Sequence, residues 1–386
     1  MNERLVTYAA PARGCGPGED GGMSYRVGQW ATGNVGRGSL RAIIEHPDLE
    51  LAGVVVSDPA KVGLDAAELA GTGRRTGVLA TADPAELIAA RPDAISYTAV
   101  GTAGRREVAT GRRPSGAVDD LCRVLENGID VVSSALIPMV HPPSADPADV
   151  RRLRAACATG EAACLTTGLD PGLMNDVLPL LLSGVCLRID SIRVSEVMCY
   201  GRWDKPEAIV GKFGFGRPLG HVPPILRPGV LALMWGPVVH LLAEHLDVPL
   251  DEVAESYELC PAPEPFDIPA GHIAKGTSAG VRFQVSGLLR GRPAITVEHV
   301  TRLREDLAPD WPAPPFGEAG GYRVEIDGEP PWRMDVANPG AADPTVPGTL
   351  ATALRLVNAI PAVVQAPPGL HTPLSLPLFT GRHLLR

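Results

Sequence analysis

The chain has 386 residues, of which 45% are hydrophobic and 20% are charged, and its formal net charge is −9. This length allows two domains, and the composition is typical of a soluble globular protein. The negative charge disfavours nucleic acid and anionic membrane surfaces as partners, and no apolar run approaches the roughly 20 residues that span a bilayer.

Residues 1–22 are rich in glycine and proline and lack the apolar segment of a signal peptide, so we interpret them as a disordered leader. Met23 precedes the first predicted strand and could be the true start.

The seven cysteines form no Cys-x-x-Cys pair, and the nine histidines form no His-Glu-x-x-His motif. These features predict free thiols in a reducing cytoplasm and no metal site.

The chain then begins with a strand at 25–30, a tight turn and a helix from Asn34. Gly33 and Gly36 have the spacing of a dinucleotide-binding turn, in which one glycine admits the pyrophosphate and the other packs the helix against the strand. The helix N-terminus offers free N–H groups to the phosphates. We therefore predict that a coenzyme is bound by Trp30, Thr32, Gly33, Asn34, Val35 and Gly36. The alternative is a tight turn that binds nothing.

A second apolar strand at 49–57 ends where the adenosine ribose of such a coenzyme would lie. Ser57 and Lys61 favour the 2′-phosphate of NADP, because a small hydroxyl and a cation suit that group. Asp58 favours NAD, because a carboxylate binds both ribose hydroxyls. We predict that the coenzyme is NADP, with NAD as the alternative. A third possibility is that these residues form an ordinary solvated turn without a binding role.

Further strands at 93–100 and 129–135 alternate with helices, which is typical of a parallel sheet. Because ligands bind at the carboxyl ends of such strands, Thr98 and Ala135 are expected beside the nicotinamide. The Gly- and Arg-rich loop 101–116 is either a flap over the coenzyme or a solvated loop.

A strand at 163–168 leads into Asp170, Pro171 and Gly172, where a proline and a glycine fit the start of a helix that points toward the coenzyme. The pattern then changes to a strand at 191–200 and two hairpin-like pairs, 278–289 with 294–303 and 321–326 with 332–336. This predicts a mostly antiparallel sheet, whose flat face must be covered by helices or a second subunit. A late helix at 347–360 and a proline-rich surface tail at 361–380 follow.

Three residues are candidates for proton transfer. Asp170 follows a strand end and could bind a cationic iminium or relay a proton, although a helix N-cap role would be purely structural. His299 shares the apolar face of its strand with Val297, and His272 lies at another strand start. Either histidine could donate a proton near neutral pH, and a hydrogen-bonded structural histidine is the alternative for each.

The run Trp30–Gly36 is similar to the Gly-x-x-Gly-x-x-Gly turn of dihydrodipicolinate reductases, with Trp30 in place of the first glycine. Together with Gly168-Leu-Asp-Pro-Gly172 and the segment 283–302, it resembles the NAD(P)H-dependent amine dehydrogenase and 2,4-diaminopentanoate dehydrogenase family. The resemblance implies a Rossmann domain at 23–165, an α+β domain with an open mixed sheet at 166–340, and a C-terminal segment at 341–386 that returns to the first domain. It also implies a homodimer built through that sheet, and hydride transfer between NAD(P)H and a C=N bond.

The chain departs from the family at one position. The resemblance implies a glutamate just after the strand at 129–135, which handles the amine proton and binds ammonia, and this position falls at Leu136 or Ile137. We therefore expect reduction of a preformed imine, iminium or related polarised bond of a small molecule. The alternatives are a dihydrodipicolinate-type reductase, for which the chain lacks a His/Lys-rich segment, and a catalytically silent coenzyme-binding regulatory protein.

Overall fold

The structure is a computed structural model that describes residues 24–99 and 116–385. The predicted leader and nearly all of the loop 101–116 lie outside these residues. The chain divides into two compact units that are each assembled from separate segments. Among the described residues, the first unit comprises 24–135, 151–165 and 356–385, and the second comprises 136–150 and 166–355.

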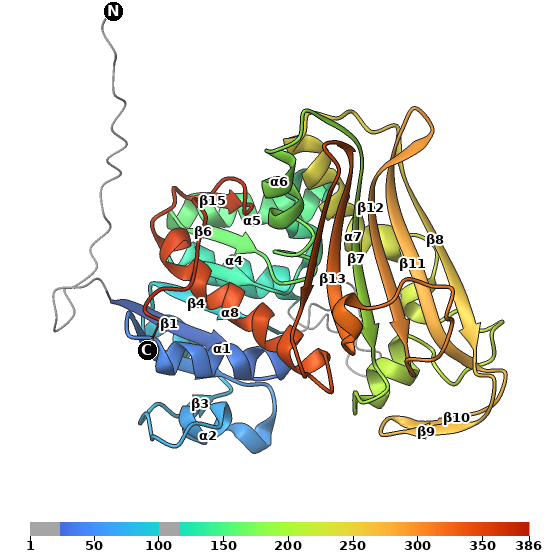
Figure 1. The fold of residues 1–386 in the computed structure, drawn as a ribbon. Helices are drawn as coiled ribbons and strands as arrows, with labels where there is room; N and C mark the ends of the chain where they lie inside the picture. The colour runs from blue at the N-terminus through green and yellow to red at the C-terminus, as the bar shows by residue number, and fades with distance from the viewer. Residues whose placement is uncertain (1–23, 100–115, 386) are drawn as a thin grey trace, which may run out of the picture. The chain divides into compact units, whose positions relative to one another are not determined.

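The first unit contains a seven-stranded sheet in the order β15-β6-β5-β4-β1-β2-β3 (Figure 1). The pairs β1–β2, β1–β4, β2–β3, β4–β5 and β6–β15 are all parallel, which confirms the predicted Rossmann-type sheet. The strands are β1 (Tyr25–Trp30), β2 (Leu49–Val55), β3 (Ala80–Thr81), β4 (Ala94–Tyr97), β5 (Asp130–Ser133), β6 (Ala163–Thr166) and β15 (Gly369–His371). The intervening helices are α1 (Asn34–Glu45), α2 (Ala66–Ala70), α3 (Pro84–Ala89), α4 (Ala117–Glu126) and α5 (Pro147–Gly160).

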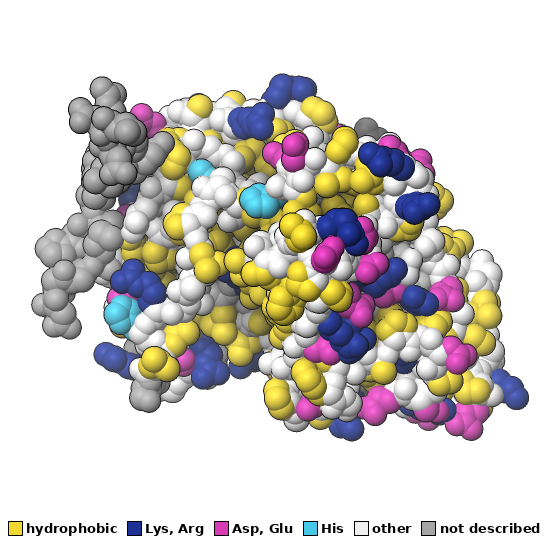
Figure 2. Space-filling view, turned by 45° about the horizontal axis from the view of Figure 1, so that its top comes forward, with side chains coloured by type: hydrophobic (Ala, Val, Ile, Leu, Met, Phe, Trp, Pro, Cys, Tyr) yellow, Lys and Arg dark blue, Asp and Glu magenta, His cyan; other side chains and the backbone are white. Residues whose placement is uncertain are grey.

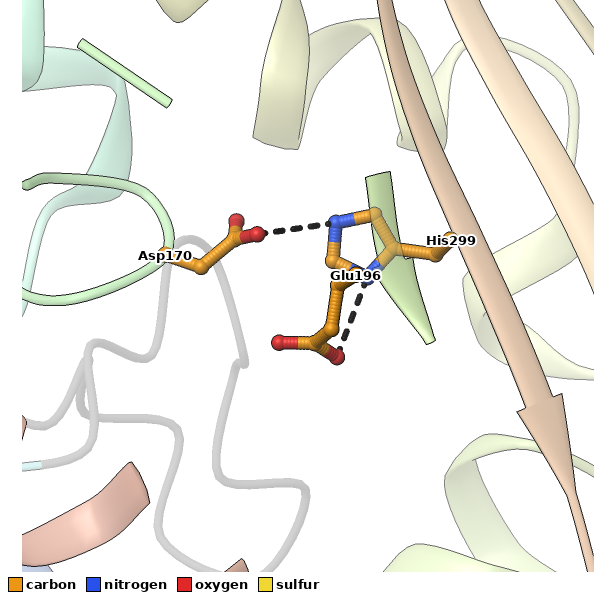
Figure 3. Close-up of side chains that lie close together, drawn as sticks. All are labelled: Asp170, Glu196 and His299. Carbon is orange, nitrogen blue, oxygen red and sulfur yellow. Dashed lines mark ion pairs between the residues drawn. The ribbon is translucent and has the colours of Figure 1, made fainter. Parts of the chain in front are cut away.

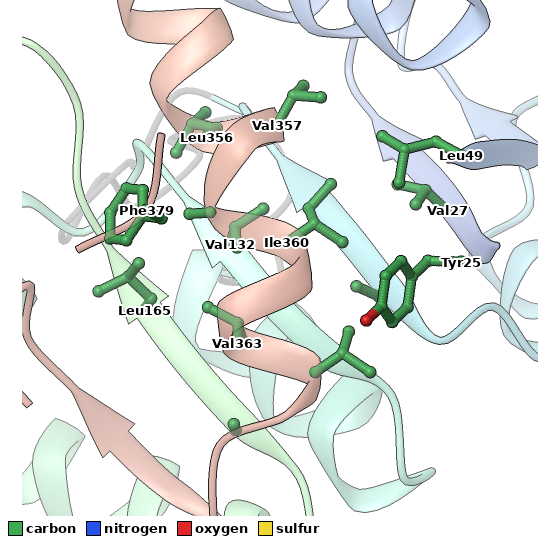
Figure 4. Packing of buried hydrophobic residues seen from close by; sticks show 14 of the residues in the cluster. Tyr25, Val27, Leu49, Val132, Leu165, Leu356, Val357, Ile360, Val363 and Phe379 are labelled. Atoms are coloured by element: carbon green, nitrogen blue, oxygen red, sulfur yellow. The ribbon is translucent and has the colours of Figure 1, made fainter. Parts of the chain in front are cut away.

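The core of the first unit lies between this sheet and the second half of α8 (Thr345–Val364). Figure 4 shows Val357, Ile360 and Val363 of α8 facing Val27 and Val132 of the sheet. Burial of such side chains stabilises each by about 1.5–3 kcal/mol. By length and composition α8 could cross a membrane, so the expectation that no apolar run approaches this length is wrong. The buried half of the helix accounts for its apolar composition.

The second unit contains a six-stranded sheet in the order β14-β13-β7-β12-β11-β8. All neighbours are antiparallel except β7 and β12, which confirms the predicted open mixed sheet. The strands are β7 (Arg188–Cys199), β8 (Glu252–Pro261), β11 (Ser278–Leu289), β12 (Arg292–Arg302), β13 (Gly320–Glu329) and β14 (Trp332–Ala337), and a separate hairpin joins β9 (Phe266–Ile268) and β10 (Gly271–Ile273). The helices are α6 (Val177–Ser183) and α7 (Val230–His245).

The two faces of this sheet differ in character. Val194 and Val324 belong to a buried cluster that includes Leu178 of α6, and α7 packs against β8, β11 and β12. On the opposite face lie alternate residues such as Arg193 and Arg323, which line a hollow of about 530 Å³. Strand alternation therefore gives one face to the helices and the other to charged side chains.

Several sequence predictions need correction. No helix starts at Pro171, because residues 170–176 form turns and α6 begins only at Val177. Strand β8, which is largely polar and exposed, was not predicted. The tail beyond residue 361 is not confined to the surface, since β15 extends the parallel sheet and Phe379 is buried in the first core.

Gly36 is required by close packing between α1 and the turn before it. A Cβ atom there would lie 2.2 Å from the carbonyl oxygen of Ala31 and 2.5 Å from Thr98 Oγ1. We expect Gly36→Ala to lower the free energy of unfolding by about 1–3 kcal/mol, because the backbone must move to admit the methyl group. Gly33→Ala is the control, since a Cβ there meets nothing within 4 Å. Equal denaturation midpoints for the two variants would contradict this packing.

Candidate active site

The first candidate site is the turn between β1 and α1, residues 30–36, which we call the coenzyme turn. Gly33 is the N-cap of α1, and no side chain caps the helix start. A Cβ at Gly33 would meet open space, so the backbone N–H groups of the first helical turn are approachable from that side. These features fit a phosphate-bearing coenzyme, because a bare helix start binds anions through its N–H groups and its dipole.

The side chains around the coenzyme turn mostly hold its backbone. Thr98 Oγ1 lies 3.0 Å from the carbonyl oxygen of Trp30, and it accepts a hydrogen bond from Gln29 Nε2 at 2.9 Å. The Trp30 ring is buried, with its centroid 5.4 Å from that of Tyr97. Ala31 has a positive φ of 72°. Trp30 and Thr98 therefore shape the turn, and their direct contact with a coenzyme stays a prediction.

The residues after β2 lie where the sequence placed the ribose. Lys61 Nζ donates to the carbonyl oxygen of Thr32 at 3.1 Å and lies 3.2 Å from Thr32 Oγ1, so its positive charge borders the coenzyme turn. Asp58 Oδ1 accepts the N–H of Ala60 at 3.0 Å, which engages this carboxylate within its own turn. Ser57 is exposed. Asp58, the carboxylate that would favour NAD, therefore already has a hydrogen-bond partner.

The other coenzyme candidates are distributed over both units. Asn34 is exposed at the helix start, while Val35 is half-buried and packs against the first core. Ala135 is buried, and its N–H donates to Ser133 Oγ at 2.9 Å. Pro171 and Gly172 belong to the second unit, in the turn that precedes α6. The structure shows no helix N-terminus at this pair.

The second candidate site is a buried cluster of Asp170, Glu196 and His299 in the second unit (Figure 3). His299 Nε2 lies 3.4 Å from Asp170 Oδ2, and His299 Nδ1 lies 3.3 Å from Glu196 Oε1. The exposed fractions of the three side chains are 3% for Asp170, 10% for Glu196 and 7% for His299. The imidazole ring thus lies between two carboxylates that come from different segments of the chain.

Strand register places two of these residues side by side. Glu196 of β7 pairs with His299 of β12, and on the outer sides Tyr322 pairs with Glu196 and Phe283 with His299. This row of four residues crosses four neighbouring strands on the helix-covered face, where all four side chains are buried. Direct cross-strand neighbours on one face have Cβ atoms about 5 Å apart, which brings their functional groups into contact.

Neutral side chains fix the orientation of both carboxylates. Asp170 Oδ1 accepts hydrogen bonds from Asn175 Nδ2 at 2.7 Å and from Trp235 Nε1 at 3.0 Å. Glu196 Oε1 accepts a hydrogen bond from the Tyr200 hydroxyl at 3.3 Å. Such donors limit the rotation of a carboxylate group.

Aromatic rings enclose the imidazole. The ring of Phe283 is stacked on that of His299, with a centroid distance of 4.7 Å and an interplanar angle of 8°, and the Trp235 ring lies at 4.6 Å. These contacts hold the imidazole plane in place and exclude water from it.

The cluster favours a charged histidine. Burial by itself lowers the pKa of His299, but the carboxylates of Asp170 and Glu196 outweigh burial and raise the pKa from 6.5 to about 10. Burial, together with the charges of Glu196 and Asp170, raises the pKa values of Tyr200 and Tyr322, so both phenols remain protonated donors. At neutral pH the imidazole of His299 is therefore held in its charged form.

The structure unites two of the three predicted catalytic residues. Asp170 and His299 belong to the cluster, whereas His272 lies on the exposed β9–β10 hairpin and pairs with Asp267 at 2.7 Å. Glu196 was not predicted, and its signal was a glutamate on the same strand face as Val194 and Met198. The three residues offer ligand atoms within 4.8 Å of one another, as a metal ion would need. However, an imidazolium has no free lone pair for a metal.

The high pKa of His299 has a direct consequence for pH dependence. Because the folded-state value lies above the ordinary one, the associated stabilisation is fully present below about pH 6.5 and is lost as the pH rises through about 10. We expect histidine ¹⁵N NMR to show His299 still doubly protonated at pH 8.5, and the free energy of unfolding to fall between pH 7 and 10. A neutral His299 signal at pH 7.5 would contradict the charged cluster.

Comparisons with known proteins identify relatives of the whole chain. The sequence profile of the 2,4-diaminopentanoate dehydrogenase C-terminal domain matches residues 173–382, more than half of the chain. An amine dehydrogenase of Streptomyces virginiae is 39% identical over 351 residues, which cover 90% of this chain and 95% of that protein. A 2,4-diaminopentanoate dehydrogenase of Acetoanaerobium sticklandii is 26% identical over 268 residues, 68% of this chain and 70% of that protein.

Solved structures share the fold. An amine dehydrogenase from Mycobacterium smegmatis has a TM-score of 0.71 at 22% identity, covering 93% of this chain and 97% of that one. A probable dehydrogenase from Thermotoga maritima has a TM-score of 0.55 at 13% identity, with coverages of 91% and 92%. The match to the family model and the 39% identity to the Streptomyces enzyme show that the chain belongs to the amine dehydrogenase and 2,4-diaminopentanoate dehydrogenase family.

Proposed function

We propose that the protein is an NAD(P)H-dependent oxidoreductase that transfers hydride between a nicotinamide coenzyme and the carbon–nitrogen bond of a small molecule. The reaction interconverts an amine and the corresponding imine or iminium. The observation that carries this proposal is the buried Asp170–His299–Glu196 cluster, because amine oxidation and imine reduction both require a proton to be handled at nitrogen.

The coenzyme turn supports the hydride transfer of the proposed reaction. When bound, the nicotinamide coenzyme supplies or accepts the hydride. Gly33 leaves room for the diphosphate, and the N–H groups at the start of α1 would bind it. The chain's own task is then to hold the substrate and to move a proton.

The Asp170–His299–Glu196 cluster supports the proton transfer of the proposed reaction. Reduction of a neutral imine adds hydride to carbon and a proton to nitrogen, and oxidation of an ammonium first removes a proton from nitrogen. Asp170 is the carboxylate that accepts this proton, and His299 is the imidazolium that can return it across their 3.4 Å contact. Trp235 and Asn175 hold Asp170 in the orientation for this exchange.

We further propose NADP as the preferred coenzyme. Lys61 lies against the coenzyme turn and Ser57 is small and exposed, which suits a 2′-phosphate, whereas Asp58 is engaged with Ala60. NAD remains the alternative if Asp58 turns toward the ribose.

A homodimer in the cytoplasm completes the proposal. The open face of the second sheet carries Arg282 and Glu298, whose side chains contact at 2.8 Å, and Arg323 paired with Asp335 at 2.7 Å. Such mixed charge suits a self-complementary two-fold interface.

On the face that Figure 2 shows, basic and acidic side chains are interspersed rather than separated by sign, which disfavours nucleic acid as a partner.

Two other functions stay open to experiment. A dihydrodipicolinate-type reductase would act on a cyclic imine that bears two carboxylates. A catalytically silent protein would bind the coenzyme without turnover, and the leucine or isoleucine at positions 136 and 137 favours this alternative.

Asp170→Asn tests the assignment of the proton acceptor. We expect NADPH oxidation with cyclic imines to fall by roughly 100-fold or more in kcat/KM, because the amide cannot accept a proton. NADPH affinity should be unchanged. Asp267→Asn, on the exposed β9–β10 hairpin, is the matched control and should retain activity. Equal activity of the two variants would remove Asp170 from the mechanism, and coenzyme binding without turnover on imines, ketones with ammonia, and ketones alone would favour the silent protein.

Lys61→Ala tests the coenzyme preference. If Lys61 lies beside the 2′-phosphate, the variant should bind NADPH about tenfold more weakly, while its affinity for NADH changes little. Lys275→Ala, an exposed lysine of the second unit, is the control for the loss of one charge. Fluorescence titration with both coenzymes measures the two affinities. Equal losses for NADPH and NADH would show instead that Lys61 only supports the backbone of Thr32.

A further inference from the structure

The charges of the Asp170–Glu196–His299 cluster do not balance. Both ring nitrogens of His299 face carboxylates, which is the arrangement of a doubly protonated imidazolium. Two carboxylates and one imidazolium leave one unit of negative charge. A buried net charge is costly unless a partner neutralises it.

The immediate neighbours do not supply the missing positive charge. Among the described residues, the contacts to the cluster come from Asn175, Trp235, Tyr200 and Phe283, which are all neutral. Tyr322 adds another neutral hydroxyl toward Glu196. Burial raises the pKa of the nearby Asp176 to about 7, and the positive charge of Arg355 opposes this rise.

The geometry suits one small cation. One atom from each of the three residues lies within 4.8 Å of the others. Two oxygens that accept hydrogen bonds of about 2.8 Å from one tetrahedral ammonium group would be about 4.6 Å apart. In addition, His299 Nε2 is buried without a well-formed hydrogen bond, although it faces Asp170. Glu196 has the largest exposed fraction of the three side chains, 10%.

Aromatic surroundings add selectivity for positive charge. The Tyr200 ring makes edge contacts with Trp203 and Phe213, at centroid distances of 5.0 and 5.7 Å. Aromatic faces attract ammonium groups and offer nothing to an anion. The Tyr200 ring is the one beside Glu196, because its hydroxyl donates a hydrogen bond to that carboxylate.

We propose that Glu196, together with Asp170, binds the positively charged nitrogen of the substrate as an ammonium ion, protonated amine or iminium. This inference rests on the proposed function, and it assigns to Glu196 the ion-pairing role for which Leu136 and Ile137 have no charge. The bound cation makes the cluster neutral. A divalent metal would instead require a neutral His299, which the contacts of both ring nitrogens disfavour.

Binding can be tested without turnover. Methylammonium chloride is titrated against the full-length protein at pH 7.5 and constant ionic strength, with sodium chloride as the reference salt, and the thermal midpoint is recorded. We expect a saturable rise in the wild type and at least tenfold weaker binding in Glu196→Gln. Glu252→Gln, on the exposed edge strand β8, is the matched control and should bind like the wild type.

A second variant guards against misfolding. Glu196→Asp keeps a carboxylate on a side chain one methylene shorter, so it should bind methylammonium more tightly than Glu196→Gln. Near- and far-UV circular dichroism, which reports on both units, checks that each variant is folded. Equal binding by the wild type and a folded Glu196→Gln would overturn the inference, and so would stabilisation by micromolar zinc or magnesium without any effect of methylammonium.

Kinetics separate this inference from the proposed function. In Glu196→Gln we expect the KM for an amine to rise at least tenfold. Imine turnover by the wild type with an unchanged amine KM in this variant would retain the proposed function and overturn the inference. Methylammonium binding that depends on Glu196, without turnover on any substrate, would support the inference and exclude the proposed function.

Discussion

The second unit depends on one buried interaction, the imidazole of His299 held between two carboxylates. Each carboxylate alone would be costly to bury, and the histidine alone would lose its proton. The two ion pairs outweigh burial and raise the pKa of His299 to about 10, so the imidazole keeps its charge. The strand register of β7 and β12, the turn before α6 and the rings of Trp235 and Phe283 all maintain this arrangement.

Under the function we propose, the first unit meets a different requirement, which is to bring backbone groups close to a phosphate. This requires no charged side chain in the coenzyme turn, only the small size of Gly33 and the tight packing at Gly36. Both requirements are local in sequence. The strand, the turn and the helix start could therefore be predicted correctly from a run of about twelve residues, and the same holds for the parallel order of alternating strands and helices.

The cluster was predictable only in part, because it is made by long-range pairing. Asp170 attracted attention as a charged residue after a strand end, and His299 as a polar residue on an apolar strand face. Glu196 is also a polar residue on an apolar strand face, as His299 is. However, nothing near it in the sequence indicates its neighbour, because β7 and β12 pair only in the folded sheet. The exposed strand β8 was missed because its polar composition resembles a loop, and β15 because three residues carry too little pattern.

This contrast bears on the missing glutamate of the family. A comparison by position finds Leu136 or Ile137 where the charge is expected and concludes that the chemistry is altered. A carboxylate can, however, reach a substrate nitrogen from any element whose register brings it there, since ion pairing depends on distance and burial and not on chain order. Glu196 stands 60 residues beyond Leu136, yet its two tyrosine neighbours and His299 give it the oriented, water-poor environment in which one negative charge interacts strongly with a cation.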